Sequence, residues 1–150
     1  MGMLTYTIDI KASKEKVWKI MFDEKTYREW TAVFHEGSYF EGSWDEGSNI
    51  RFLAMDEGKL NGMFSRVIKN TPYEHLSLEH LGEIRDGRED TTSESAREWV
   101  GAHENYSFSE DLGITTLVVS MDGAGLDEKM KEMFEGLWPP ALAKLKEMAE

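Results

Sequence analysis

The chain has 150 residues, a length that fits one domain able to bury about 70% of the surface exposed by the unfolded chain. It contains 17 Lys and Arg against 29 Asp and Glu, a formal net charge of -12. This charge has the wrong sign for binding nucleic acid phosphates or acidic membranes. The absence of cysteine excludes disulfides, thiolate nucleophiles and iron–sulfur clusters.

No targeting or membrane-spanning segment is recognisable. The first residues, MGMLTYTIDIKAS, lack a basic region followed by an apolar one. No stretch approaches the ~20 apolar residues that a transmembrane helix needs. We therefore expect one domain over residues 1–150, located in the cytoplasm, with no membrane span and no nucleic acid partner.

The N-terminal part predicts a strand followed by two short helices. Apolar residues alternate from Thr5 to Ile10, the period of a half-buried strand. Ser13 precedes apolar residues at helical spacing up to Phe22, which predicts an N-cap and a helix. A second short helix is predicted from Lys25 to Trp30, where Tyr27 and Trp30 share one face.

The middle of the chain has the pattern of an antiparallel sheet, with short alternating runs separated by glycine and acidic turns. The polar segment from Glu83 to Arg97 predicts a mobile surface loop. Six further strands are predicted, near Gly37 to Trp44, Ile50 to Met55, Leu60 to Lys69, Leu76 to Leu81, Glu98 to Phe108 and Thr115 to Met121.

The last segment, Leu126 to Glu150, has apolar residues three and four apart, which predicts one long helix packed on a sheet. Pro139 and Pro140 interrupt this pattern, and a proline deep in a helix costs ~3 kcal/mol or more. We therefore expect a kink near Glu135 to Trp138, or two helices end to end.

Three stretches of the chain resemble one known family in order and spacing. The first is ASKEKVWKIMFDEKTYREW, from Ala12 to Trp30, the second runs from Gly47 to Leu78, and the third is the closing WPPALAKLKEMAE. Together they resemble the START-like or SRPBCC superfamily, in the branch similar to activators of the Hsp90 ATPase.

The resemblance implies an α+β helix-grip fold, in which a curved seven-stranded antiparallel sheet wraps around the long C-terminal helix. Two short helices follow the first strand. Members of this superfamily bind hydrophobic small molecules between sheet and helix, and some catalyse cyclisation or hydrolysis there. The chain departs from the branch at Pro139-Pro140, in the acidic loop from Arg85 to Glu98, and at His80, where an aromatic residue is usual.

The residues themselves offer little support for catalysis or metal binding. His75 and His80 are five apart, so on one regular strand they would face opposite sides. His80 is in phase with Leu76 and Leu78 and is expected to point inward, either as a hydrogen-bonded core residue or as the polar anchor of an apolar pocket. We assign no catalytic residue, no metal site and no cofactor.

Carboxylates such as Glu79, Glu104 and Asp122 are expected to be solvated or hydrogen-bonded rather than catalytic. On the predicted strand before Phe108, Trp99 and His103 would face away from Tyr106 unless a bulge intervenes.

The chain is rich in residues that suit adaptable apolar sites, with nine Met, five Trp, five Tyr and seven Phe. They either fill an ordinary core or line a ligand cavity. The candidate ligand-binding residues are Phe52, Phe64, Leu78, His80, Tyr106, Met121, Met130, Met133, Phe134 and Trp138.

These observations leave three hypotheses for function. The first is binding of an apolar or aromatic small molecule, oriented by His80 or a nearby tyrosine. The second is docking on an Hsp90-like chaperone ATPase through the outer surface, which the resemblance suggests. The third is a cyclase or hydrolase using the same cavity, for which His80 is the distinctive candidate.

Overall fold

The computed structural model of the protein describes residues 2–123 and 125–150. The elements follow one another along the chain as β1 (Gly2–Ile10), α1 (Lys14–Phe22), α2 (Glu24–Thr31), β2 (Tyr39–Gly42), β3 (Asn49–Asp56), β4 (Lys59–Thr71), β5 (His75–Arg85), β6 (Arg88–Asp90), α3 (Glu94–Arg97), β7 (His103–Asp111), β8 (Ile114–Gly123) and α4 (Glu128–Ala149).

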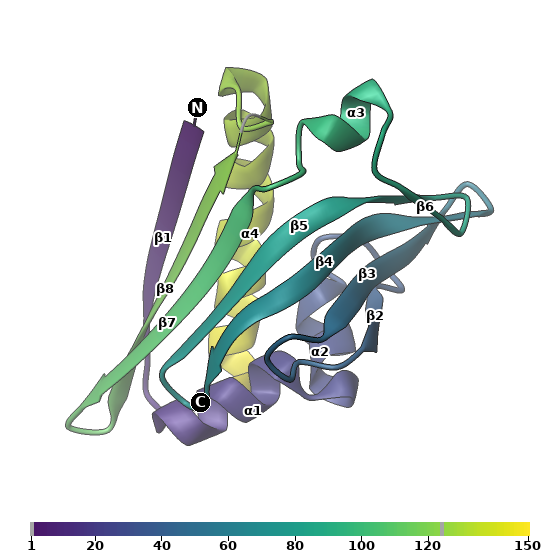
Figure 1. The fold of residues 1–150 in the computed structure, drawn as a ribbon. Helices are drawn as coiled ribbons and strands as arrows, with labels where there is room; N and C mark the ends of the chain where they lie inside the picture. The colour runs from purple at the N-terminus through teal and green to yellow at the C-terminus, as the bar shows by residue number, and fades with distance from the viewer. Residues whose placement is uncertain (1, 124) are drawn as a thin grey trace.

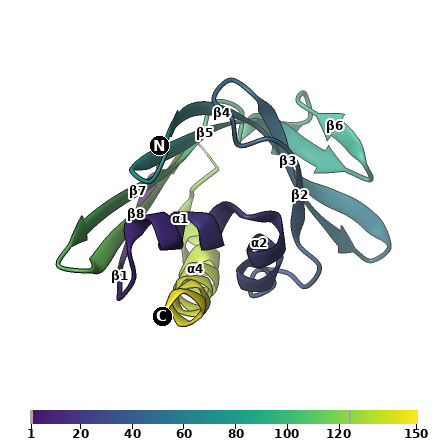
Figure 2. The ribbon, with the colours of Figure 1, turned by 90° about the horizontal axis from the view of Figure 1, so that it is seen from below.

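Within the described residues, the strands form one antiparallel sheet in the order β1-β8-β7-β5-β4-β3-β2, and the short β6 pairs with β5. Seen from below, the sheet is an arch with α4, α1 and α2 beneath it (Figure 2). Figure 1 shows α4 running along the sheet near β1 and β8, with α1 and α2 at one end and α3 at the other. The predicted helix-grip architecture is therefore confirmed, with β6 as an additional short strand.

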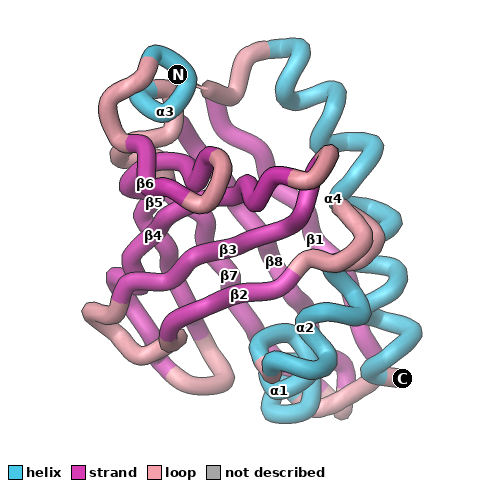
Figure 3. Tube along the Cα trace, turned by 90° about the vertical axis from the view of Figure 1, so that its right-hand side faces the viewer, coloured by secondary structure: helices cyan, strands magenta, loops and turns pink. Residues whose placement is uncertain are grey.

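The segment from Glu83 to Arg97 differs from the predicted mobile loop. It contains the end of β5, the strand β6 and the helix α3. Ser93 caps α3 by accepting a hydrogen bond from the Ala96 N–H (3.1 Å), and Ala96 is fully buried. Figure 3 shows α3 lying above β5 and β6. Because Ile84 and the small Ala96 are the buried hydrophobic residues of this segment, its composition gave no apolar pattern to detect.

The two N-terminal helices form as predicted. The Ser13 hydroxyl accepts a hydrogen bond from the Lys16 N–H (3.2 Å) and caps α1. The Asp23 carboxylate accepts one from the Lys25 N–H (3.0 Å) and caps α2. Since Asp23 also ends α1, the two helices join without a loop, which directs the aromatic face of α2 under the sheet.

The final helix α4 continues through both prolines, so of the two predicted alternatives, two helices end to end is wrong. The kink near Glu135 to Trp138 stays a prediction. Pro139 and Pro140 are exposed, as are Glu135 and Gly136 one turn earlier, whose carbonyls lose their helical partners. Because those carbonyls lie on the solvent side, water can satisfy them. The opposite face of α4 places Leu142 and Leu145 in the core with β1 and β8 residues such as Ile10 and Val119.

No helix in the described part of the chain is long and apolar enough to cross a membrane.

Candidate ligand-binding cavity

A cavity of about 570 Å³ lies between the concave face of the sheet, α2 and α4. This volume is within the ~300–1,000 Å³ of typical small-molecule sites. The sheet contributes Phe52, Met63, His80, Glu104, Tyr106 and Met121, the α2 side contributes Tyr27, Trp30, Thr31 and Phe34, and α4 contributes Met130, Met133, Phe134, Leu137 and Trp138. The walls are therefore mainly aromatic rings and methionine side chains.

The structure brings eight of the ten candidate binding residues to this cavity. They are Phe52, His80, Tyr106, Met121, Met130, Met133, Phe134 and Trp138. Their placement comes from two periodicities, because Tyr106 and Met121 face inward on neighbouring strands while Met130, Phe134 and Trp138 are four residues apart on α4.

The other two candidates do not line the cavity. Phe52 pairs with Met63 across β3 and β4, so Met63 shares its face and Phe64 points to the opposite, convex side. There the Phe64 ring lies 6.0 Å from the Arg51 guanidinium. The prediction for Phe64 is therefore wrong, because strand alternation alone did not fix the register between strands. Leu78 is fully buried in the core and does not reach the cavity.

Aromatic contacts hold the cavity wall together on the helical side. Trp138 is buried and lies edge-on to Phe34, with ring centroids 4.9 Å apart. It also contacts Trp30 (6.3 Å) and Tyr106 (6.4 Å). These contacts join α2, α4 and β7, so the wall is formed by packed rings with few rotatable bonds.

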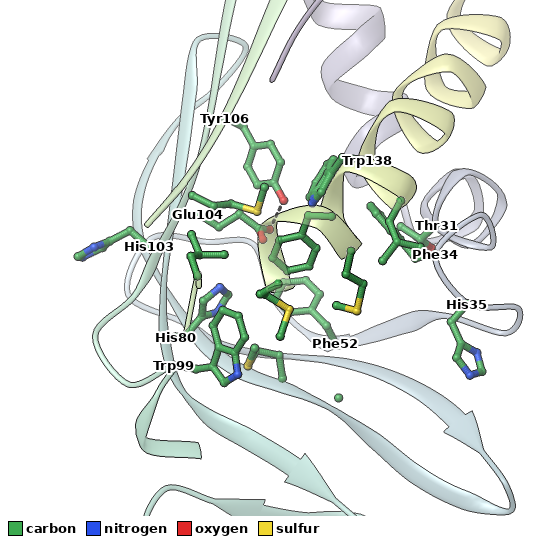
Figure 4. A pocket seen from close by; sticks show the side chains of 18 of the residues that line it. Thr31, Phe34, His35, Phe52, His80, Trp99, His103, Glu104, Tyr106 and Trp138 are labelled. Atoms are coloured by element: carbon green, nitrogen blue, oxygen red, sulfur yellow. Dashed lines mark hydrogen bonds between the residues drawn. The ribbon is translucent and has the colours of Figure 1, made fainter. Parts of the chain in front are cut away.

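The main polar feature of the cavity is a carboxyl and phenol pair on β7. Glu104 and Tyr106 are two residues apart and face the same side, and the Tyr106 hydroxyl donates a hydrogen bond to Glu104 Oε2 (Figure 4). Burial raises the pKa of the Glu104 carboxyl, and the hydrogen bond from Tyr106 opposes this effect. Burial also raises the pKa of Tyr106, and the nearby Glu104 raises it further. The pair therefore disfavours negative charge at both side chains.

His80 is the second polar group of the wall, and the Ser65 hydroxyl lies 2.7 Å from its Nδ1. Both residues are buried. Burial, and to a smaller extent the nearby His103, lower the pKa of His80 to about 4, while Asp122 acts in the opposite direction. His80 is thus a neutral imidazole at pH 7. His80 faces inward as predicted. It is both a buried residue hydrogen-bonded to Ser65 and a residue of the cavity wall, so each of the two predicted alternatives is partly correct.

Trp99 lines the cavity although the predicted strand placed it on the face opposite Tyr106. The strand β7 begins at His103, and residues 98–102 form turns after α3. Strand alternation therefore does not apply to Trp99, and its ring turns inward. The His103 ring points away from the cavity (Figure 4), with Nδ1 3.3 Å from Asp122 Oδ1 and Nε2 3.8 Å from Glu79 Oε2.

Sequence reasoning missed Glu104 and the aromatic residues of α2 as cavity residues. Glu104 is in phase with Tyr106 and Phe108, which was the available signal, but 29 carboxylates made any one of them inconspicuous. Tyr27 and Trp30 were predicted on one helix face, yet nothing in the sequence indicated what that face would cover.

The described residues contain no group of three or more His, Asp or Glu side chains arranged to hold a metal ion.

Comparison with known proteins identifies the fold class first and then the family. In the fold comparison, the chain is similar to the Aha1 dimer from Colwellia psychrerythraea, with a TM-score of 0.73 and 18% identity over 100% of this chain and 97% of that one. It is also similar to ChR145 from Cytophaga hutchinsonii, with a TM-score of 0.74 and 17% identity over 99% and 93%. A third is CV1439 from Chromobacterium violaceum, with a TM-score of 0.69 and 15% identity over 100% and 99%. These similarities show a shared helix-grip fold.

The family follows from the sequence match. The model of the family described as Activator of Hsp90 ATPase homolog 1-like protein matches residues 11–150. The chain belongs to this family, which confirms the resemblance found in its sequence. A search among curated proteins gave no match.

Proposed function

We propose that this protein binds an apolar or aromatic small molecule in the cavity between the sheet and α4. The observation that carries the proposal is a cavity of about 570 Å³ with aromatic and methionine walls. A space of this size and character suits a drug-sized molecule buried mostly by apolar contacts. Methionine side chains adapt to ligands of different shape, which favours binding over a fixed packing role.

Two methionine substitutions, one inside and one outside the cavity, test the proposed binding site. Met130 is partly buried against the core and lines the cavity, so Met130→Glu places a charge among apolar groups. Met55 is 53% exposed on β3 and does not line the cavity, so Met55→Glu is the matched control. Both variants need a circular dichroism spectrum that matches the parent protein.

The measurement is native mass spectrometry of gently purified protein, followed by denaturing extraction of any bound molecule. We expect a small molecule on the parent protein and on Met55→Glu, and its loss from Met130→Glu. A folded Met130→Glu protein that retains the molecule at the same stoichiometry contradicts the proposed site.

A second function, docking on an Hsp90-like chaperone ATPase, is favoured by the family to which the chain belongs. Such docking would use the outer surface, where the net charge of -12 resides mainly. Affinity for a purified ATPase of this kind should then fall with added salt and be unchanged by Met130→Glu. The two functions are therefore separable with the same variant.

A further inference from the structure

Two polar side chains lie next to each other on the sheet wall of the cavity. Glu104 on β7 is the cross-strand partner of Leu78 on β5. Two residues further along β5, the backbone N–H of His80 donates a hydrogen bond to the Ala102 carbonyl (2.8 Å). His80 and Glu104 are therefore diagonal neighbours, roughly 7 Å apart, on the concave face. Both line the cavity. One small group can contact both side chains at once.

In both Glu104 and His80, one polar atom of the side chain is hydrogen-bonded by a protein group and the other is not. The Tyr106 hydroxyl donates to Glu104 Oε2, and Ser65 bonds His80 Nδ1. Among the described residues, no protein group hydrogen-bonds the remaining atoms, Glu104 Oε1 and His80 Nε2. Neither of these two atoms is completely buried. Since both residues line the cavity, both atoms are accessible from it.

In the uncharged forms of Glu104 and His80, both of these atoms are hydrogen-bond donors. Burial raises the pKa of the Glu104 carboxyl, which favours the protonated form. In that form the proton lies on Oε1, because Oε2 accepts the hydrogen bond from Tyr106. Ser65 is fully buried, and its hydroxyl proton would lack an acceptor unless it is donated to His80 Nδ1. The neutral imidazole then carries its proton on Nε2.

The lining of the cavity favours uncharged ligands. The described lining residues include no Lys or Arg to neutralise an anion. The two other acidic lining residues are already engaged, since Glu83 contacts Arg85 (3.3 Å) and Ser95, and Asp122 contacts His103 (3.3 Å). A cation would therefore have to share these carboxylates with their present partners.

We propose, building on the binding function above, that the ligand is an uncharged aromatic molecule carrying a carbonyl-type oxygen. This oxygen accepts hydrogen bonds from Glu104 and His80, while the aromatic part contacts the rings of α2 and α4.

Four naphthalene probes of similar size test this ligand class by isothermal titration calorimetry at pH 7. The first pair is 2-acetylnaphthalene and 2-isopropenylnaphthalene, in which a methylene group replaces the carbonyl oxygen. The second pair is 2-naphthoate and 1-(2-naphthyl)ethylammonium, which carry opposite charges. We expect the ketone to bind about fivefold more tightly than the isopropenyl compound. Both charged probes should bind more weakly than either neutral one.

Variants then assign the preference to Glu104. Glu104→Gln retains an acceptor for Tyr106 and a donor toward the cavity, so the ketone preference should persist. Glu104→Leu removes the donor, and the preference should fall to within about twofold. Glu79→Gln, on the neighbouring strand and facing His103 outside the cavity, is the control. Thermal melting of each variant checks that it is folded.

The outcomes separate the two proposals. If neither neutral probe binds, the proposed binding function is overturned. If the neutral probes bind equally, or if 1-(2-naphthyl)ethylammonium binds best and loses affinity in Glu104→Gln, the cavity binds ligands but the assigned ligand class is wrong. A ketone preference that survives in Glu104→Leu overturns the role of Glu104.

Discussion

Acidification tests whether His80 is a buried, neutral imidazole. The pKa of His80 falls from 6.5 to about 4 on burial in the folded protein. Between these values the unfolded chain binds a proton that the folded protein does not, so stability is lost as pH falls from 6.5 towards 4. With these two pKa values the loss attributable to His80 is about 2.5 kcal/mol at pH 4.5 relative to pH 7.

Urea unfolding at pH 7 and pH 4.5 measures this loss, followed by tryptophan fluorescence. The matched variant is His80→Gln, which can still hydrogen-bond Ser65 but does not titrate. Its stability should fall about 2.5 kcal/mol less than that of the parent protein over the same pH interval. His35→Gln, which removes a half-exposed ring, controls for the loss of a histidine. Parallel losses in the parent protein and His80→Gln would refute the reasoning.

Three further changes test packing and backbone geometry by urea unfolding at pH 7. Leu145→Ala removes a fully buried side chain of α4 and should lower the free energy of unfolding by about 2–5 kcal/mol, whereas a loss below 1 kcal/mol would contradict the core described here. Pro139→Ala should raise it by about 1 kcal/mol or more, because a helical hydrogen bond to the Glu135 carbonyl becomes available, and protection of the new amide in hydrogen exchange checks the cause. Gly62→Ala should lower it by more than about 2 kcal/mol, since the new Cβ would lie 1.7 Å from the Phe52 carbonyl oxygen. The control Gly136→Ala, which meets nothing within 4 Å in α4, should raise it by about 0.5–1 kcal/mol.

The elements that the sequence predicted well are those with a strong local pattern. Alternation from Thr5 to Ile10 predicted β1, and the Ser13 cap followed by apolar residues predicted α1. The long stripe on α4 predicted a helix against the sheet, although Pro139 and Pro140 suggested a kink or two helices end to end. The helix does not divide in two because the packed apolar face outweighs two lost hydrogen bonds at the solvent side.

The errors in the predictions arise where the position of a side chain depends on the pairing between strands or on a single buried residue. Phe52 and Phe64 have the same parity along the chain, but they lie on different strands, and the pairing of Phe52 with Met63 turns Phe64 outward. Likewise, α3 is anchored by the buried Ala96, and the turns that follow it leave Trp99 outside β7, which begins at His103. No periodicity within one segment contains this information.

The cavity residues divide in the same way. The methionine and aromatic residues of α4 were identifiable from spacing, because one helix fixes their common face. Glu104 was not, since its importance depends on Tyr106 beside it and His80 on the next strand. A carboxyl among 29 is unremarkable by composition, whereas burial raises the pKa of this one, an effect that the hydrogen bond from Tyr106 opposes. The polar character of this cavity therefore depends on contacts among Glu104, Tyr106 and His80 that form only in the folded protein. For this reason no sequence motif predicted it.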